Sequence, residues 1–334
     1  MVGKFDAEEL DKFIQHLVAE DRFSGVVLIA KNGKPILRKA YGLASKQFNV
    51  ANKTDTKFNI ASLSKIFTKT AIAKLVEQGK LAYDDFVGKH LPYFPSDIAN
   101  NVTINHLLTM TSGMGDYWNE RFEASIGKLK TVDDFIRLFI DDPLLFRPGE
   151  KRRYSNNGYV VLGKIIEVLS GQSYYDYIKE NIYKPAGMSN SDHYELDIPV
   201  PNLAIGYTKE GLKCSSQNAS RKNNTFLIGI KGSPAGGGYS TVNDLLKFDK
   251  ALHNNVLLSP KYTSTILLPA NAEPGKEPRV ATLAGGAPGA AAFYVKYFAS
   301  GHTVIILSNY DPEDAEAVKD KIHNMMENPE PATS

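Results

Sequence analysis

The alternation of apolar and polar residues predicts a β-hairpin near each end of the chain. Near the N-terminus, GVVLIAKNGKPILRKAYG contains two β-rich runs joined by Asn32-Gly33, the pair that best accepts the positive φ angles of a tight turn. Near the C-terminus, AAFYVKYFASGHTVIILSN repeats this pattern with Ser300-Gly301 at the turn. An amphipathic helix is predicted before the first hairpin and a second, acid-capped helix after the last one.

The stretch between the hairpins, roughly residues 60–200, shows mainly helical periodicity, with Pro and Gly interrupting it at FRPGEK and KPAGM. The simplest arrangement is an α+β fold in which both hairpins join one antiparallel sheet flanked by helices. The predicted sheet lobe comprises residues 1–58 and about 205–326, and the inserted helical lobe comprises about 59–204. A cleft is expected between the lobes, and residues 327–334 are predicted to be a disordered tail.

Composition narrows the class of partner. The chain has 334 residues, 43% of them apolar, and a formal charge of +2 from 39 basic and 37 acidic side chains. This gives no electrostatic case for nucleic acid or an anionic membrane, so a small-molecule partner is expected. The single cysteine, Cys214, excludes an internal disulfide and a cysteine zinc cluster, and no His-Glu-x-x-His run replaces one. We therefore expect no metal and no other cofactor.

The longest apolar runs, such as TVIILS, are strand-sized and shorter than a membrane span. The first 23 residues carry acids and lysines where a signal peptide needs an apolar stretch. As written, the chain is expected to be soluble and cytoplasmic. A periplasmic or secreted protein whose leader had been removed would have the same features.

The first candidate for chemistry is Ser62-Leu63-Ser64-Lys65, at the start of a predicted helix. The free amides and the dipole at a helix N-terminus stabilise an oxyanion, and Lys65 lies one turn from Ser62 on the same face. A neutral lysine can take the serine proton. Alternatively, the serines are only the polar start of a packing helix. Ser-x-x-Lys is expected about once or twice by chance in such a chain, and Ser125 to Lys128 is a second copy.

The second candidate is Tyr154-Ser155-Asn156, between a Pro-Gly turn and a predicted helix that begins near Asn157. The tyrosine could relay a proton, and the asparagine amide could bind both the lysine and a substrate carbonyl. The structural alternative is a tyrosine packed at a helix entrance, with Asn156 as the cap. Tyr117-Trp118-Asn119 shows that this triplet also recurs by chance.

Other patterns point away from competing chemistries. Gly158 to Lys164 has the spacing of a phosphate-binding loop, but bulky apolar residues fill it and Ile165 replaces the magnesium-binding Ser or Thr, so we interpret it as a core helix. No Gly-x-Ser-x-Gly elbow occurs, and none of the seven histidines has an obvious partner motif. Two glycine-rich stretches, GSPAGGGYSTVNDLLKF and LAGGAPGAAAFY, could line a site or form only turns.

In their order along the chain, these pieces resemble the serine β-lactamase and penicillin-binding protein superfamily. The similarity is to its class C-like branch, with D-alanyl-D-alanine carboxypeptidases, D-aminopeptidases and family VIII carboxylesterases. The resemblance extends over nearly the whole chain and shows in four segments: FNIASLSKIFTKTAIAKLVEQGKL, VTINHLLTMTSGM, PGEKRRYSNNGYVVLGKIIEVLSG and PAGGGYSTVNDLLKF. Four ordered segments are more specific than any one triplet, and the family's fold agrees with the sheet and inserted helical lobe.

The resemblance implies a role for each candidate residue. Ser62 corresponds to the acylated nucleophile, Lys65 to its proton acceptor, and Tyr154 to the proton relay toward the leaving group and water. Asn156 corresponds to the residue that orients the substrate carbonyl. The oxyanion hole would use the backbone amides of Ser62 and Gly286. Ser64 and Ser125 then have no catalytic role.

The third motif of the family is incomplete in this sequence. Relatives have Lys or His, any residue and then Gly, whereas this chain has Leu283, Ala284 and Gly285, followed by Gly286. We expect Leu283, Gly285 and Gly286 to border the substrate, but the missing cation weakens acid/base support and carboxylate recognition. One hypothesis is a serine hydrolase that favours ester, amide or peptide substrates without a carboxylate. The alternative is a catalytically attenuated scaffold that binds a ligand or a protein.

Overall fold

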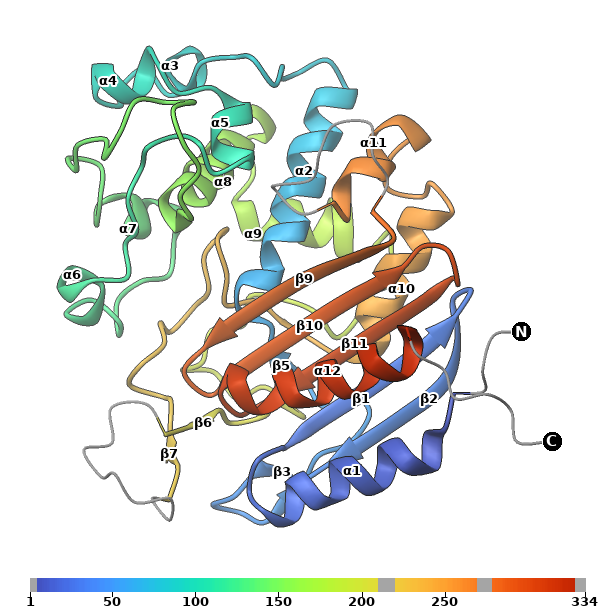
Figure 1. Ribbon diagram of the computed structural model, residues 1–334. Coiled ribbons are helices and arrows are strands. Elements are labelled where there is room, and N and C mark those ends of the chain that lie inside the picture. Colours follow the sequence, from blue (N-terminus) through green and yellow to red (C-terminus); the bar gives the residue numbers. More distant parts are fainter. Residues whose placement is uncertain (1–4, 210–219, 269–277, 328–334) are drawn as a thin grey trace.

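A five-stranded antiparallel sheet joins the two ends of the chain. The computed structural model describes residues 5–209, 220–268 and 278–327, and within them the strand order of this sheet is β2-β1-β11-β10-β9 (Figure 1). Its strands are β1 (Gly25–Lys31), β2 (Lys34–Tyr41), β9 (Val280–Ala287), β10 (Ala290–Tyr297) and β11 (His302–Ser308). The fold class and both predicted hairpins are confirmed, because β1 pairs with β2 and β10 with β11, and β1 also pairs with β11.

The two predicted turns adopt the backbone that their residues favour. Asn32 and Gly33 have φ angles of 48° and 72°, and Gly301 has a φ of 70°. Glycine and asparagine tolerate this left-handed region better than other residues. The turn residues therefore fix the hairpin ends from local sequence alone.

Helices cover both faces of the sheet. Helices α1 (Ala7–Ala19) and α12 (Pro312–Glu327) lie on one face, where Leu10 and Val318 share a core with Val27 and other sheet residues (Figure 1). On the other face, the alternate residues Val26 and Leu28 belong to the core formed with the remaining helices. Strands covered on both faces are apolar almost throughout, which explains the continuous burial of β10 and β11.

Most of the remaining elements lie between β2 and β9 in the sequence. The prediction of helical structure for residues 60–200 agrees with the structure. The helices of this stretch are η1 (Ala61–Ser64), α2 (Lys65–Glu77), α3 (Val87–His90), α4 (Ser96–Ala99), α5 (Ile104–Leu108), α6 (Glu120–Glu123), α7 (Val132–Ile136), α8 (Asn156–Ser170), α9 (Tyr174–Ile178) and the π-helical turn η2 (Lys179–Tyr183). They are followed by α10 (Val242–His253) and α11 (Pro260–Ile266). Short strand pairs complete the fold: β3 (Leu43–Ser45) with β4 (Val50–Ala51), β5 (Phe58–Asn59) with β8 (Tyr239–Ser240), and β6 (Tyr207–Thr208) with β7 (Lys222–Asn223).

The lobe boundaries at 58/59 and 204/205 stay a prediction. The disordered tail was predicted for residues 327–334. This prediction is wrong at Glu327, which is the last residue of α12, and residues 328–334 lie outside the described residues. Among the helices of the described ranges, none is long and apolar enough to cross a membrane.

Candidate active site

The turn that carries Ser62 is shaped by its neighbours on both sides. Ser62 lies in the short helix η1, which leads directly into α2. Ala61, just before it, has a φ of 43°, in the left-handed region that alanine rarely adopts. Its amide donates to Asn59 Oδ1 at 2.8 Å, which helps to hold this backbone in place. Strained residues of this kind concentrate at functional sites.

Residues from the two predicted motifs meet in one cluster around the Lys65 amine. Ser62 Oγ lies 2.6 Å from the Tyr154 hydroxyl and 3.1 Å from Lys65 Nζ. Lys65 Nζ donates to the Tyr154 hydroxyl at 2.6 Å and to Asn156 Oδ1 at 2.7 Å. It also donates to the carbonyl oxygen of Ala235, in the glycine-rich stretch before β8. The cluster therefore joins the start of α2, the loop before α8 and the glycine-rich segment.

Burial changes the acid/base properties of this cluster. Lys65 is 7% exposed, and its burial lowers the pKa of the amine to about 7, with the carboxylate of Asp116 opposing the shift. Burial also raises the pKa of the Tyr154 hydroxyl, although 45% of the residue's surface is exposed, because the hydroxyl points inward to Ser62 and Lys65. A lysine with a pKa near neutrality can act as a general base.

Asp116 was not among the candidates from sequence, yet it fixes the orientation of Asn156. The Asn156 Nδ2 group donates to both carboxylate oxygens of Asp116, at 3.1 and 2.9 Å. The amide oxygen of Asn156 consequently faces Lys65. Ser155 caps α8 by accepting from the Gly158 amide at 3.2 Å, and its hydroxyl donates to the Gly115 carbonyl at 2.7 Å. The loop that carries Tyr154 is thus anchored on both sides.

The edge strand β9 approaches Ser62 closely at Gly285. A Cβ at this position would lie 2.9 Å from the Ser62 amide nitrogen and 2.2 Å from the Ile60 carbonyl oxygen. Only glycine allows such contact. Leu283 is half-buried, packs against the main core and lines a cavity of about 190 Å³ together with Lys65 and Tyr154. Leu283, which was aligned with the family's cationic position, therefore lies beside the cluster of Ser62, Lys65 and Tyr154.

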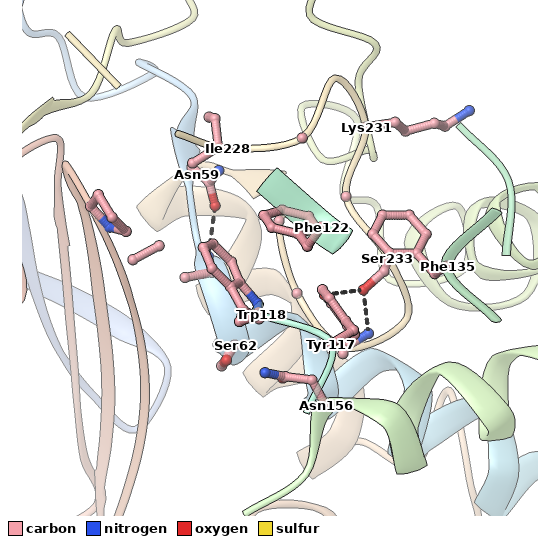
Figure 2. Close-up of a pocket in the computed structure, with 18 of the residues that line it drawn as sticks. Asn59, Ser62, Tyr117, Trp118, Phe122, Phe135, Asn156, Ile228, Lys231 and Ser233 are labelled. Atoms are coloured by element: carbon pink, nitrogen blue, oxygen red, sulfur yellow. Dashed lines mark hydrogen bonds between the residues drawn. The ribbon is translucent and has the colours of Figure 1, made fainter. Parts of the chain in front are cut away.

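A larger cavity of about 470 Å³ opens on the other side of Ser62. Gly286 and Asn156 line it, and Figure 2 shows the rings of Trp118 and Phe122 next to each other above Ser62 and Asn156. The centroids of these two rings are 4.7 Å apart. The rest of the wall includes Tyr117, Phe135, Tyr194, Leu196, Ile228 and Ile230. The cavity is therefore largely apolar and aromatic away from the serine.

The sequence analysis treated Tyr117-Trp118-Asn119 as a chance repeat, but Tyr117 and Trp118 line this cavity. The sequence signal that could have distinguished this triplet is the acidic residue directly before it, Asp116. The glycine-rich stretch before β8 also lines the cavity, with Gly236 and Gly237. None of the seven histidines lines either cavity at Ser62.

The other sequence candidates do not belong to the cluster around Lys65. Ser64 is buried and accepts from the Gly238 amide at 3.1 Å. Gly158 to Lys164 forms part of α8, where Val160 and Leu162 are fully buried, so the phosphate-loop pattern is a core helix, as interpreted from sequence. Ser125 lines neither cavity at Ser62.

Comparison with known proteins identifies relatives along nearly the whole chain. Residues 10–324 match the family described as Beta-lactamase. The chain is 32% identical to penicillin-binding protein 4* of Bacillus subtilis (strain 168), over 92% of this chain and 73% of that protein. The penicillin binding protein of Bacillus halodurans has a similar structure, with a TM-score of 0.80 and 30% identity over 93% of this chain and 99% of its own. EstCE1, a hydrolase with promiscuous acyltransferase activity, shares the fold, with a TM-score of 0.77 and 20% identity over 95% and 98% of the two chains.

Proposed function

We propose that this chain, which belongs to the β-lactamase family of serine hydrolases, hydrolyses neutral esters or amides through an acyl-enzyme on Ser62. The observation that carries the proposal is the position of the buried Lys65 amine, 3.1 Å from Ser62 Oγ and 2.6 Å from the Tyr154 hydroxyl. A nucleophilic serine needs a base within hydrogen-bond reach that is unprotonated near neutral pH. A pKa lowered by burial to about 7 supports that role for Lys65.

The hydrogen-bond partners of Lys65 are compatible with a neutral amine. Two of its oxygen neighbours, Asn156 Oδ1 and the Ala235 carbonyl, can only accept. A neutral amine has two hydrogens, so it can donate to both of these oxygens and keep its lone pair for a hydroxyl. Ser62 and Tyr154 are the hydroxyls within reach. This arrangement favours proton transfer from Ser62 to Lys65, directly or through Tyr154.

In the proposed reaction, Ser62 Oγ attacks the acyl carbon while its proton passes to Lys65. The carbonyl oxygen becomes an oxyanion, and the amides of Ser62 and Gly286 are its proposed donors. When the tetrahedral intermediate collapses, the bond to the leaving group breaks, and Tyr154 transfers the proton to that group. Water then attacks the acyl-enzyme and gives a proton to the same pair. When the second tetrahedral intermediate collapses, the bond to Ser62 Oγ breaks, the pair returns the proton to Oγ, and the acid is released.

We infer a preference for substrates without a carboxylate from Leu283, whose side chain offers no charge to the cavity it lines beside Tyr154. Two cations also line this cavity. Lys69 donates to the carbonyls of Thr265 and Leu268. The second cation is Arg152, which would receive a substrate carboxylate if one binds.

The test combines turnover with detection of the adduct. The protein should hydrolyse p-nitrophenyl acetate, and intact-mass analysis after treatment with a fluorophosphonate should show one adduct. Ser62→Ala should abolish both, whereas Ser125→Ala, in the second Ser-x-x-Lys, should abolish neither. The neutral ester should react faster than the carboxylate-bearing β-lactam nitrocefin. Faster nitrocefin hydrolysis would contradict the preference for substrates without a carboxylate.

A second candidate function is a binding scaffold with little turnover, and the observation that favours it is the loss of the family's Lys or His at Leu283. This alternative predicts neither ester hydrolysis nor an adduct on Ser62. It would be supported if a folded sample gave both negative results.

A further inference from the structure

A second apolar groove continues from the cavity at Ser62. Its volume is about 370 Å³, and it shares Trp118, Phe122 and Pro288 with that cavity. Beyond these shared residues it is lined by Ile126, Leu227 and Phe226. The two hollows therefore adjoin at these three side chains, and together they are called the path below.

Phe226 at the outer part of this path has 85% of its surface exposed. Large apolar side chains that border a groove and remain exposed often mark a binding surface for an apolar ligand. The charged residues of the groove are Glu123 and Lys222, one of each sign, so it has no net charge to attract a charged group. The groove therefore suits an uncharged hydrocarbon chain.

The contacts of the catalytic residues indicate which part of a substrate enters this path. Gly286, a proposed donor to the carbonyl oxygen, lines only the larger of these two cavities, and Lys65 lines only the smaller one, beside Leu283, whereas Ser62 and Tyr154 line both. The acyl group should follow its carbonyl into the larger cavity. The leaving group should lie toward the side from which Lys65 and Tyr154 supply a proton.

We propose that the substrates are esters or amides of medium- or long-chain apolar acids, and that the acyl chain runs from Ser62 past Trp118 and Phe122 into the groove bordered by Phe226. This inference rests on the proposed function, because it assigns the acyl specificity of the same site. Transfer of each methylene out of water improves binding at most about fourfold, and less in a groove open to solvent.

The first test is a series of p-nitrophenyl esters from acetate to octanoate, below their micelle concentrations. The ratio of kcat/KM for octanoate to that for acetate should be at least about tenfold, and Phe226→Ser should lower this ratio at least threefold. Phe48→Ser is the matched control, because Phe48 is 77% exposed and lines neither the groove nor the cavities at Ser62. It should leave the ratio unchanged. If the protein hydrolyses the acetate ester but the ratio is near one, or if Phe226→Ser leaves the ratio unchanged, the proposal that the groove binds the acyl chain is wrong.

A second test does not depend on turnover. Trp118 is the only tryptophan in the chain and lines both hollows, so its fluorescence reports their occupancy. In Ser62→Ala, N-methyldodecanamide, whose long chain is on the acyl side, should change the emission at concentrations at which N-methylacetamide has no effect, and Phe226→Ser should weaken this response. Equal responses to the two amides would refute the proposal that the groove binds an apolar chain. Loss of ester hydrolysis and of the adduct in the unmodified protein, with the fluorescence response intact, would refute only the proposed reaction.

Discussion

At the scale of single residues, two opposing influences set the charge of Lys65. Burial lowers the pKa of its amine to about 7, and the carboxylate of Asp116 raises it. A base must be unprotonated to accept the serine proton, so kcat/KM for a neutral ester should rise between pH 6 and 8 with an apparent pKa near 7. Measurement of initial rates from pH 5 to 9 tests this. A profile that is flat across this range would rule out Lys65 as the titrating base.

Asp116→Asn should move that acid limb to lower pH, because it removes the negative charge that favours protonated Lys65. The plateau should also fall about tenfold, since a charge-assisted hydrogen bond worth roughly 1.5 kcal/mol no longer orients Asn156. Glu120→Gln is the control, because it makes the same change of charge at an exposed residue that lines neither cavity at Ser62. A lower plateau with an unmoved limb would mean that Asp116 acts only through geometry.

At the scale of elements, the site depends on how closely β9 packs against η1. A methyl group at Gly285 would overlap the backbone of both Ile60 and Ser62. Gly285→Ala should therefore destabilise the fold by about 1–3 kcal/mol and lower kcat at least tenfold by displacing the strand that carries Gly286. Urea denaturation and ester kinetics measure the two effects. Gly127→Ala is the control, because a Cβ there meets nothing within 4 Å. Equal stability of the two variants would contradict the close packing of β9.

The elements were largely predictable from sequence because their signals are local. Asn32-Gly33 and Ser300-Gly301 set the two hairpins, and the Thr241 cap, whose hydroxyl accepts from the Asp244 amide at 3.1 Å, begins α10. The contact between Asp116 and Asn156 was not predictable, because these residues are forty positions apart and belong to different segments. The aromatic wall at Trp118 was missed for the same reason, since only tertiary packing brings it to Ser62.

At the scale of the whole molecule, one buried cation connects distant parts of the chain. The Arg221 side chain has no exposed surface, stacks 3.9 Å from the Tyr310 ring and pairs with three carboxylates: Asp21 at 3.5 Å, Asp311 at 3.2 Å and Asp314 at 2.6 Å. Asp311 also accepts from the Gly289 amide at 2.8 Å, at the β9–β10 turn. Arg221 therefore links the residues just after α1, the start of α12 and the β9–β10 hairpin, which carries Gly286. Such burial of a charged residue is not visible in the pattern of apolar positions.

Arg221→Met should lower the free energy of unfolding by about 3 kcal/mol at pH 7, because the mostly buried carboxylates of Asp311 and Asp314 lose their ion pair with the arginine. Burial raises the pKa of Asp314, and Arg221 opposes this shift; Arg221 also adds to the effect of Lys46 and Tyr310 in lowering the pKa of Asp21. Both groups should therefore have higher folded-state pKa values in the variant. Their protonation then favours the folded state at low pH, and the deficit should shrink between pH 7 and pH 4. Urea denaturation at both pH values measures this. Arg137→Met, at an exposed ion pair with Asp134, should change stability by less than about 0.5 kcal/mol. A deficit of Arg221→Met that is the same at pH 4 and pH 7 would show that the arginine stabilises the fold by packing on Tyr310 rather than by neutralising the carboxylates.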